Sequence, residues 1–234
     1  MVAKGAFNMQ LVFHGHSCVE IRLNNGTVLL VDPWIVGNPQ SDIDLNFKCD
    51  FILVTHGHQH HSGDMITLSQ KNNAPIIGMS ELVHYAESKG TVPGHAMDLG
   101  GQWSFDFGTV KTTHAQHGSS LTLEGLPVYM GEACGFLIMA DDQIVYIAGD
   151  TSNYGDMALF GKAYDIDVAV LPIGDNYTMG PKAAASAAQR VKAKLVVPVH
   201  YNTFADIKQD PTEFAKLLPD GVVKVLKPGD KLEI

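Results

Sequence analysis

The segment THGHQHHSGD, residues 55–64, holds four histidines within six positions, directly after the apolar run Phe51–Val54. Neutral imidazole is a common ligand of borderline metal ions such as zinc. His56 and His58 are two residues apart, so a turn after a strand can aim both side chains at one ion. His61 can face a second ion from the start of the next helix. The spacing predicts a metal site, and a histidine-rich surface loop is the alternative.

Other polar residues that can bind metals follow apolar runs much later in the chain, namely His117, Asp150 and His200. In α/β proteins, functional sites form beyond the carboxyl ends of strands, where loops converge. A carboxylate such as Asp150 can bridge two ions about 3.5–4 Å apart, which is the arrangement of two-metal hydrolytic centres. These strand-end positions favour the metal site over the surface loop.

The elements that must position these residues are short, β-rich runs separated by turn signals. Strand candidates cover residues 9–15, 18–23, 27–32, 51–56, 74–78, 104–115, 134–140, 143–150, 168–174, 195–201 and 223–234. Helix candidates cover 61–73, 80–90, 181–193 and 211–219, with Ser80 as an N-cap and Pro181 at a first helical position. The second half broadly repeats the plan of the first. The pattern predicts two packed sheets with helices outside, an α/β sandwich.

Composition narrows the class of protein. The chain has 234 residues, of which 45% are hydrophobic and 18% charged, so we expect one folded domain over residues 1–234. Its net charge of -9 argues against a nucleic-acid partner. Three scattered cysteines without a CxxC pair favour reduced thiols, and no apolar run has the length of a membrane span. We therefore expect a cytoplasmic protein, without the glycine-rich motifs of nucleotide cofactors.

Several motifs resemble one known superfamily. THGHQHHSGD resembles the HxHxDH signature of the metallo-β-lactamase fold, and QHGSS, AGDT and PVHYNTF resemble its later ligand motifs. FHGHSCVEI, VDPWIVGNP, LPIGDNYTMGP and VVPVHYNTF are similar to the metal-dependent hydrolase group related to ascorbate-6-phosphate lactonase and N-acylphosphatidylethanolamine phospholipase D. The resemblance implies a four-layer αββα sandwich with the site at one edge of the two sheets.

The resemblance also implies a set of ligands. For the first metal these are His56, His58 and His117, and for the second metal they are His61 and His200, with Asp150 between the two ions. Zinc is the expected metal, one or two ions, with manganese or iron as alternatives because histidine and aspartate sites accept all three. Asp150 is also the expected catalytic residue that orients the attacking water.

One position departs from the family pattern. His60 stands where the superfamily has an aspartate that ligates the second metal and helps to orient the water. Histidine can bind a metal, but it is neutral and bulkier, so the second ion is less well neutralised. Three outcomes are open: His60 ligates the second ion, the second site is empty, or the site is impaired. We expect a filled first site and a weakened second one, with His60 kept as a candidate metal ligand and catalytic residue.

Further positions have both a structural and a functional interpretation. Asp32 is expected to accept a hydrogen bond from a ligand histidine. His16 either supports a metal ligand through a hydrogen bond, contacts substrate, or only stabilises a turn. The loop Asp175–Thr178 is either a helix-entry turn or a substrate-facing wall. Tyr201 and Asn202 follow a predicted ligand and can reach the substrate. The remaining polar residues that we interpret as structural are His14, His84, His95, His114, Ser119 and Ser120.

The predicted activity is hydrolysis of a small ester or lactone by a metal-activated water. Phosphodiester hydrolysis is the alternative within the same chemistry. A metal-binding protein without catalysis is the alternative from another class, and His60 is the feature that favours it. Redox chemistry at a di-iron centre occurs in the same fold, but it generally comes with a flavin-binding domain for which this chain has no room. The resemblance further implies that copies of the chain associate.

Overall fold

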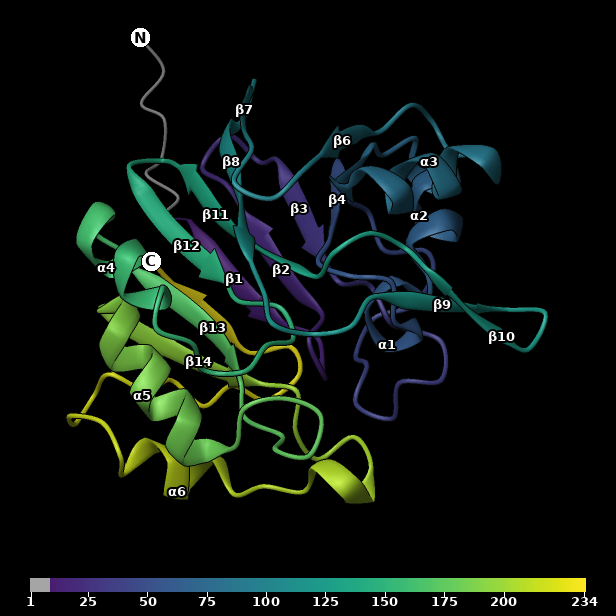
Figure 1. The fold of residues 1–234 in the computed structure, drawn as a ribbon. Coiled ribbons are helices and arrows are strands. Elements are labelled where there is room, and N and C mark those ends of the chain that lie inside the picture. Colours follow the sequence, from purple (N-terminus) through teal and green to yellow (C-terminus); the bar gives the residue numbers. More distant parts are fainter. Residues whose placement is uncertain (1–8) are drawn as a thin grey trace, which may run out of the picture.

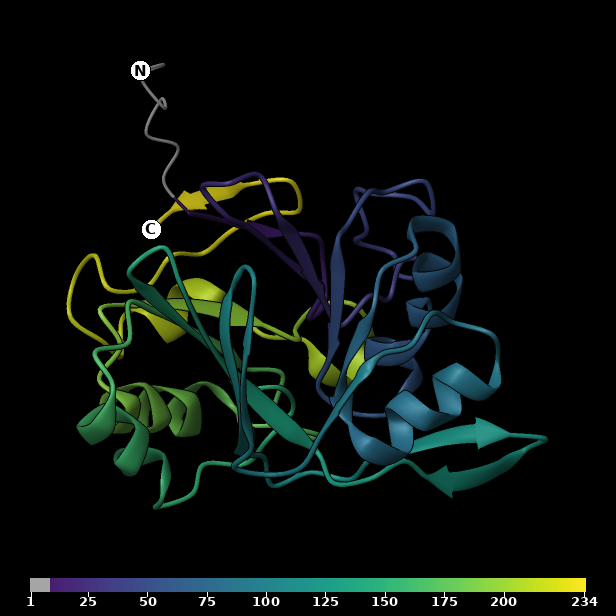
Figure 2. The same cartoon turned by 90° about the horizontal axis from the view of Figure 1, so that it is seen from above.

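A computed structural model describes residues 9–234. Two mixed β-sheets pack face to face, and helices cover their outer faces (Figures 1 and 2). The first sheet has the strand order β15-β1-β2-β3-β4-β5-β6, and the second has the order β14-β13-β12-β11-β8-β7. A separate hairpin, β9–β10, projects from one side (Figure 2). The predicted αββα sandwich is confirmed.

The first sheet contains β1 (Gln10–Phe13), β2 (Val19–Arg22), β3 (Val28–Val31), β4 (Phe51–Val54), β5 (Ile76–Met79), β6 (His95–Met97) and β15 (Lys231–Glu233). The second contains β7 (Gln102–Phe105), β8 (Gly108–His114), β11 (Cys134–Ala140), β12 (Gln143–Ile147), β13 (Val168–Pro172) and β14 (Leu195–Val199). The hairpin is β9 (Ser120–Leu123) and β10 (Leu126–Tyr129). The helices are α1 (Gln59–Ser62), α2 (Met65–Asn72), α3 (Ser80–Ser88), α4 (Met157–Ala163), α5 (Pro181–Val191), α6 (Pro211–Ala215) and the short 3-10 turn Ala205–Ile207.

Each sheet is antiparallel at first and parallel later. β1, β2 and β3 pair antiparallel, and β3 to β6 then pair parallel. In the second sheet, β7, β8, β11 and β12 pair antiparallel, followed by the parallel strands β13 and β14. The second half therefore repeats the plan of the first, as predicted. In the first sheet β1, β3 and β4 end at the same edge, and in the second β8, β12, β13 and β14 do so, which brings the loops after them together.

Three apolar clusters separate the four layers. Along β11, Phe136 and Ile138 belong to the cluster between the sheets, whereas Leu137 faces the cluster that includes α5. Along β4, Leu53 faces the other sheet, and Ile52 and Val54 face the side of α2 and α3. Because both faces of these strands are covered, they are nearly continuous apolar runs in the sequence. This is why pattern alone located most of them.

The structure differs from the prediction at several elements. The helix expected over 61–73 is two helices, α1 and α2, because the chain turns at Gly63 and Asp64. The Asp64 carboxylate accepts hydrogen bonds from the backbone N–H groups of Ile35 at 2.7 Å and Val36 at 2.9 Å, so this break holds the loop after β3. Helix α4 and strands β6, β9 and β10 were not predicted, and the candidate 223–234 yields only β15.

The ends of two helices test the capping predictions. Helix α5 begins at Pro181, as predicted. Ser80 is wrong as an N-cap, because Met79 occupies that position and Ser80 is the first helical residue. The Ser80 hydroxyl instead donates to the Asp98 carboxylate at 3.2 Å. Among residues 9–234, no helix is both long and apolar enough to span a membrane.

Candidate metal centre

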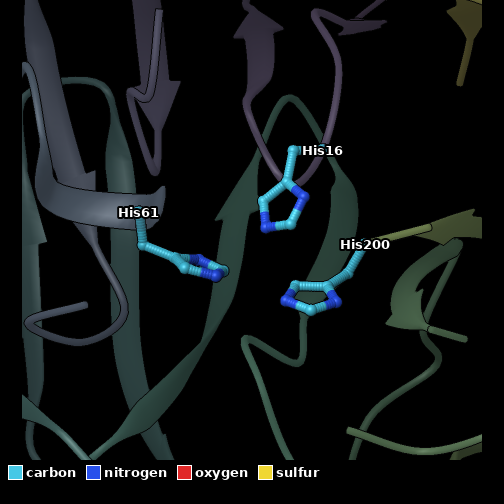
Figure 3. A group of neighbouring side chains, drawn as sticks. All are labelled: His16, His61 and His200. Atoms are coloured by element: carbon cyan, nitrogen blue, oxygen red, sulfur yellow. The ribbon is translucent and has the colours of Figure 1, made fainter. Parts of the chain in front are cut away.

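The turns that follow the site-forming strands have unusual backbones. His16 after β1, Asp32 after β3 and His200 after β14 have φ angles of 57°, 48° and 57°. Non-glycine residues rarely adopt this left-handed conformation, and residues held in it cluster at functional sites. All three side chains are buried, and the rings of His16 and His200 lie close together, with centroids 4.2 Å apart (Figure 3). The structure thus uses strained turns to aim polar side chains inward.

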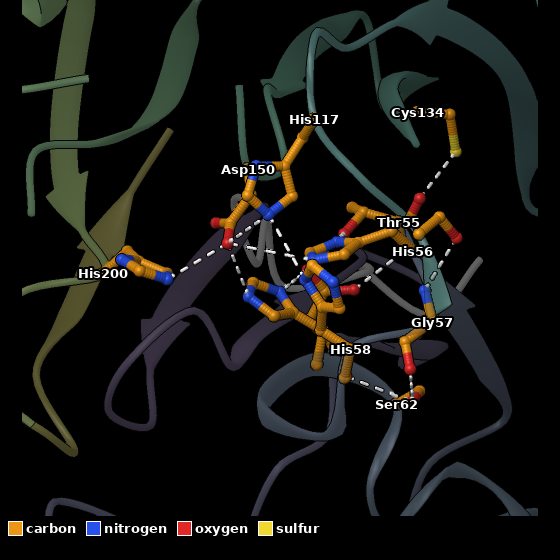
Figure 4. Close-up of polar contacts among 12 residues, drawn as sticks. Thr55, His56, Gly57, His58, Ser62, His117, Cys134, Asp150 and His200 are labelled. Atoms are coloured by element: carbon orange, nitrogen blue, oxygen red, sulfur yellow. Dashed lines mark hydrogen bonds and ion pairs between the residues drawn. The ribbon is translucent and has the colours of Figure 1, made fainter. Parts of the chain in front are cut away.

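Three imidazoles converge from β4 and the loop after β8. His56 Nε2 lies 3.0 Å from His58 Nδ1, and His117 Nε2 lies 3.2 Å from the same His58 atom (Figure 4). These separations are near the edge of about 3.3 Å expected for a tetrahedron with zinc–nitrogen bonds of 2.0–2.1 Å. The structure therefore brings together the three residues predicted to bind the first metal.

Asp150, in the loop after β12, lies at the centre of the histidines. Its Oδ2 atom is 3.0 Å from His200 Nε2, 3.2 Å from His61 Nε2, 3.6 Å from His117 Nε2 and 3.8 Å from His56 Nε2 (Figure 4). One carboxylate oxygen is thus near imidazoles of both predicted ligand sets. This is the position that a bridging carboxylate requires.

Asp32 orients His61. Its carboxylate accepts hydrogen bonds from Thr55 N at 2.8 Å and Thr55 Oγ1 at 2.7 Å, and it lies 2.8 Å from His61 Nδ1. This contact places the proton of His61 on Nδ1 and leaves Nε2 directed at Asp150. The predicted hydrogen bond between Asp32 and a candidate ligand is confirmed.

The pKa values show which nitrogens are ready to bind a cation. Burial, followed by the neighbouring imidazole of His117, lowers the pKa of His58 to about 4. Burial likewise lowers the pKa of His56 and His117. For His61, burial acts in the opposite direction, but the Asp150 and Asp32 carboxylates raise its pKa to about 10. The first three imidazoles are therefore neutral at pH 7, whereas the His61 ring is protonated on both nitrogens at this pH.

The buried polar atoms at this centre fit a cation. Asp150 Oδ1 and His16 Nε2 are buried, and neither has a hydrogen-bond partner in the described part of the chain. Leaving such a group unpaired costs roughly 1–3 kcal/mol, so each one requires an explanation. Although burial disfavours its charged form, Asp150 has a pKa well below the usual range because His200 and His61 lie beside it. A carboxylate surrounded by imidazole nitrogens is a donor set that binds divalent metals.

A cavity of about 440 Å³ opens onto these residues. Its lining residues are His58, His60, His61, His117, Asp150, Tyr177, His200, Phe204 and Asp206. Tyr177 comes from the loop predicted as a substrate-facing wall, whereas Asp175 and Asn176 line a shallower neighbouring hollow. Sequence reasoning missed Phe204 and Asp206, and the only signal for them was that they closely follow His200. The cavity is large enough for a small organic substrate.

His60 lies at the rim of this cavity. Its side chain is exposed, and its ring centroid is 4.5 Å from that of Trp34 and 5.1 Å from that of Phe204. Within residues 9–234, the groups of side chains close enough to share an ion do not include His60. These groups are His56, His58 and His117; His56, His61 and Asp150; and His16, His61 and His200.

The other candidates have structural contacts. His14 lies between Glu20 and Asp42, at 3.2 Å and 2.8 Å. Ser119 Oγ accepts a hydrogen bond from Gly57 N at 3.1 Å, which supports the turn between His56 and His58. Asn202 is exposed, and its side chain accepts a hydrogen bond from the Gln209 backbone.

The comparisons with known proteins agree with this fold. Residues 10–200 match the family model described as the beta-lactamase superfamily domain. A UPF0173 metal-dependent hydrolase of Enterococcus faecalis is 49% identical over 225 residues, covering 96% of this chain and 99% of that protein. One from Geobacillus sp. is 50% identical over 228 residues, covering 97% and 100%. Igni18, a metallo hydrolase of Ignicoccus hospitalis, has a similar structure, with a TM-score of 0.85 and 32% identity over 97% of this chain and 99% of that one. The chain belongs to the UPF0173 family of metal-dependent hydrolases within this superfamily.

The Asp32→Asn variant tests the orienting role of Asp32. An amide cannot replace both acceptor oxygens, so we expect metal binding at the group containing His61 to weaken by about 10–100-fold. Competition with a chromophoric chelator measures the dissociation constant. Asp50→Asn is the matched control, because the Asp50 carboxylate also accepts a backbone hydrogen bond, from Val28 at 2.8 Å, but at the opposite end of β4. Equal affinities of the two variants would contradict the role.

Proposed function

We propose that this chain is a binuclear hydrolase that cleaves a carboxylic ester or lactone in a small molecule. The observation that carries the proposal is the position of Asp150 Oδ2, within 3.0–3.8 Å of imidazole nitrogens from both ligand sets. In this proposal, His56, His58 and His117 hold one ion, His61 and His200 hold the other, and Asp150 joins them. The donor set favours zinc.

The residues of the cavity suggest how the reaction proceeds. Bound divalent ions would supply Lewis acidity and a water whose pKa is lowered toward about 7. Asp150 Oδ1, a buried acceptor without a partner among residues 9–234, orients the nucleophilic water. His60 faces the same cavity, and the partial desolvation of its ring against the cavity wall, together with His61, lowers its pKa, so it is neutral at pH 7. We assign His60 to take the proton of the water and to return it to the leaving alkoxide.

The cavity wall favours an uncharged substrate. Among residues 9–234, its lining includes no lysine or arginine, the side chains that usually clamp phosphate groups, and Asp206 adds a carboxylate. Tyr177 and Phe204 offer aromatic surface for the apolar part of a substrate. An ester or lactone meets both conditions better than a phosphodiester. The second candidate is nevertheless phosphodiester hydrolysis, because paired metals suit in-line displacement at phosphorus.

A substrate panel tests the proposal. The zinc-loaded chain is assayed with γ- and δ-lactones, p-nitrophenyl carboxylic esters and bis(p-nitrophenyl) phosphate. We expect kcat/KM for the best lactone or ester to exceed that for the phosphodiester by about 100-fold or more, equivalent to roughly 2.7 kcal/mol. The reverse order would support the second candidate. No turnover by a fully loaded protein would favour a metal-binding role without catalysis.

The net charge of the chain and its cysteines support the proposed class of substrate and the proposed compartment. The net charge of -9 supports a small-molecule substrate rather than a nucleic acid. Cys18, Cys49 and Cys134 are free and buried, as expected for a protein that acts in the reducing cytoplasm.

Metal loading is expected to release a proton. Because the Asp150 and Asp32 carboxylates hold the pKa of His61 near 10 against the effect of burial, the metal-free protein carries this proton at pH 7. Binding two zinc ions should therefore release about one proton per chain, and the affinity should rise by up to about tenfold per pH unit below pH 10. Calorimetry in buffers of different protonation enthalpy measures the release. The His61→Asn variant should release about one proton fewer than the parent, and equal release by both proteins would contradict the assignment.

A further inference from the structure

The second metal of the proposed function lacks a ligand. His61, His200 and Asp150 supply three donors, and the fourth should come from position 60, where the family has an aspartate. His60, however, is exposed at the rim, with its ring against Trp34 and Phe204. A different side chain lies nearer to His61 and His200.

That side chain is His16, in the turn after β1. It is completely buried, and one of its nitrogens lies within 4.8 Å of ligand atoms of His61 and His200, which are also within 4.8 Å of each other. Figure 3 shows the three rings around a common space. The ring centroid of His16 is 4.2 Å from that of His200 and 5.5 Å from that of His61. These side chains come from three turns that are far apart in the sequence.

The hydrogen bonds of His16 assign its two nitrogens different roles. Nδ1 lies 2.7 Å from the Thr203 hydroxyl, which is buried and can accept a hydrogen bond from it. Nε2 is buried and has no partner among residues 9–234. A protonated Nδ1 leaves a lone pair on Nε2, which is the tautomer that a metal ligand requires.

The backbone fixes His16 relative to His200. Both residues have a left-handed φ of 57°, and the His200 N–H donates to the His16 carbonyl at 2.7 Å. The turn packs closely against Gln40, because a Cβ at Gly15 would meet the Gln40 side chain at 2.8 Å and its backbone at 2.9 Å. If His16 had only a packing role, its contact with Thr203 would be explained, but its buried Nε2 atom would stay unpaired. An unpaired buried polar atom costs free energy. A cation shared with His61 and His200 satisfies that atom.

We propose that His16 is a ligand of the second metal, through Nε2, in place of the carboxylate that position 60 lacks. This inference rests on the proposed function, since it concerns the second ion of that centre. Each ion then has three imidazoles and shares Asp150, so the two sites have the same donor set. Replacing a carboxylate with an imidazole favours zinc over manganese at the second site. His60 is then free to act on the substrate.

Two variants separate His16 from His60. Zinc binding is measured by equilibrium dialysis and elemental analysis in the parent, His16→Ala and His60→Ala proteins. The parent and His60→Ala should each bind two ions. His16→Ala should keep one ion, and its affinity for the second should fall by at least about 100-fold. This exceeds the roughly 10–100-fold loss that is typical when a residue that only hydrogen-bonds to a metal ligand is replaced. Loss of the second ion in His60→Ala but not in His16→Ala would overturn the proposal, as would two tightly bound ions in both variants.

A measurement on the unaltered protein covers the case in which His16→Ala does not fold. Zinc is titrated while imidazole nitrogen chemical shifts are followed by NMR. The His16 Nε2 signal should shift with the second equivalent of zinc and not with the first, while Nδ1 keeps its proton. An unshifted His16 Nε2 at two bound ions would overturn the role of His16 and leave the binuclear hydrolase intact. A parent that binds two ions through His16 but turns over no ester, lactone or phosphodiester would instead reject the proposed function alone.

Discussion

The Asp150→Asn variant should lose bound zinc from both sites, and its kcat/KM should fall by at least about 1,000-fold, or roughly 4 kcal/mol of transition-state stabilisation. Among the described residues that line the cavity, Asp150 is the carboxylate that lies beside the imidazoles, and its Oδ2 is close to both ligand sets. An amide has no negative charge to offset two cations. The repulsion between the two ions is therefore no longer compensated, and the neutral imidazoles hold them more weakly. Elemental analysis and steady-state kinetics measure the two effects.

A matched variant separates chemistry from folding in this experiment. Asp167 is also a buried aspartate of the second sheet, but it precedes β13 and accepts a hydrogen bond from the Ile144 backbone at 2.8 Å. Asp167→Asn should lower the free energy of unfolding and leave the zinc content unchanged. If Asp150→Asn retained two ions and full activity, the bridging position of Asp150 would have no functional meaning.

Removal of the metals by a chelator should lower the melting temperature of the protein by about 8–16 °C. A ligand present at 1,000 times its dissociation constant stabilises the folded state by about 4.1 kcal/mol. For a chain of this size, each kcal/mol corresponds to roughly 2–4 °C. The physical reason is that the metal-free centre crowds buried imidazoles around one carboxylate and leaves Asp150 Oδ1 and His16 Nε2 unpaired.

Calorimetric scans at pH 7 with and without chelator test this expectation, and added zinc should restore the higher melting temperature. The Asp150→Asn variant is the control, because a protein that binds no metal should not respond to the chelator. An unchanged melting temperature after verified metal removal would show that the centre is folded and stable without ions.

Much of the fold could be predicted from local sequence. β11 and β4 are buried on both faces, so Phe136, Leu137 and Ile138 form an unbroken apolar run that pattern detects. The residues of the centre were recognisable for a related reason: a polar side chain directly after such a run must lie at a sheet edge. His56, Asp150 and His200 meet this condition, and so does Asp32, whose contact with His61 was expected.

Which histidine faces the centre and which faces the rim depended on the three-dimensional structure. His60 and His61 are adjacent in α1, and one residue turns a helix by about 100°, so His61 faces Asp32 while His60 faces the rim. Sequence spacing does not state which of the two faces inward, because that depends on how α1 packs against the sheets.

The sequence by itself determined the two-sheet sandwich and a histidine-rich centre at its edge, because apolar periodicity and strand-end polar residues are local signals. Only the tertiary structure placed His16 beside His200, since these residues are far apart in the chain and are joined by a backbone hydrogen bond between two left-handed turns. The same is true of Phe204 and Asp206 in the cavity wall. Contacts between distant turns depend on how the sheets pack, and no periodicity in the chain encodes them.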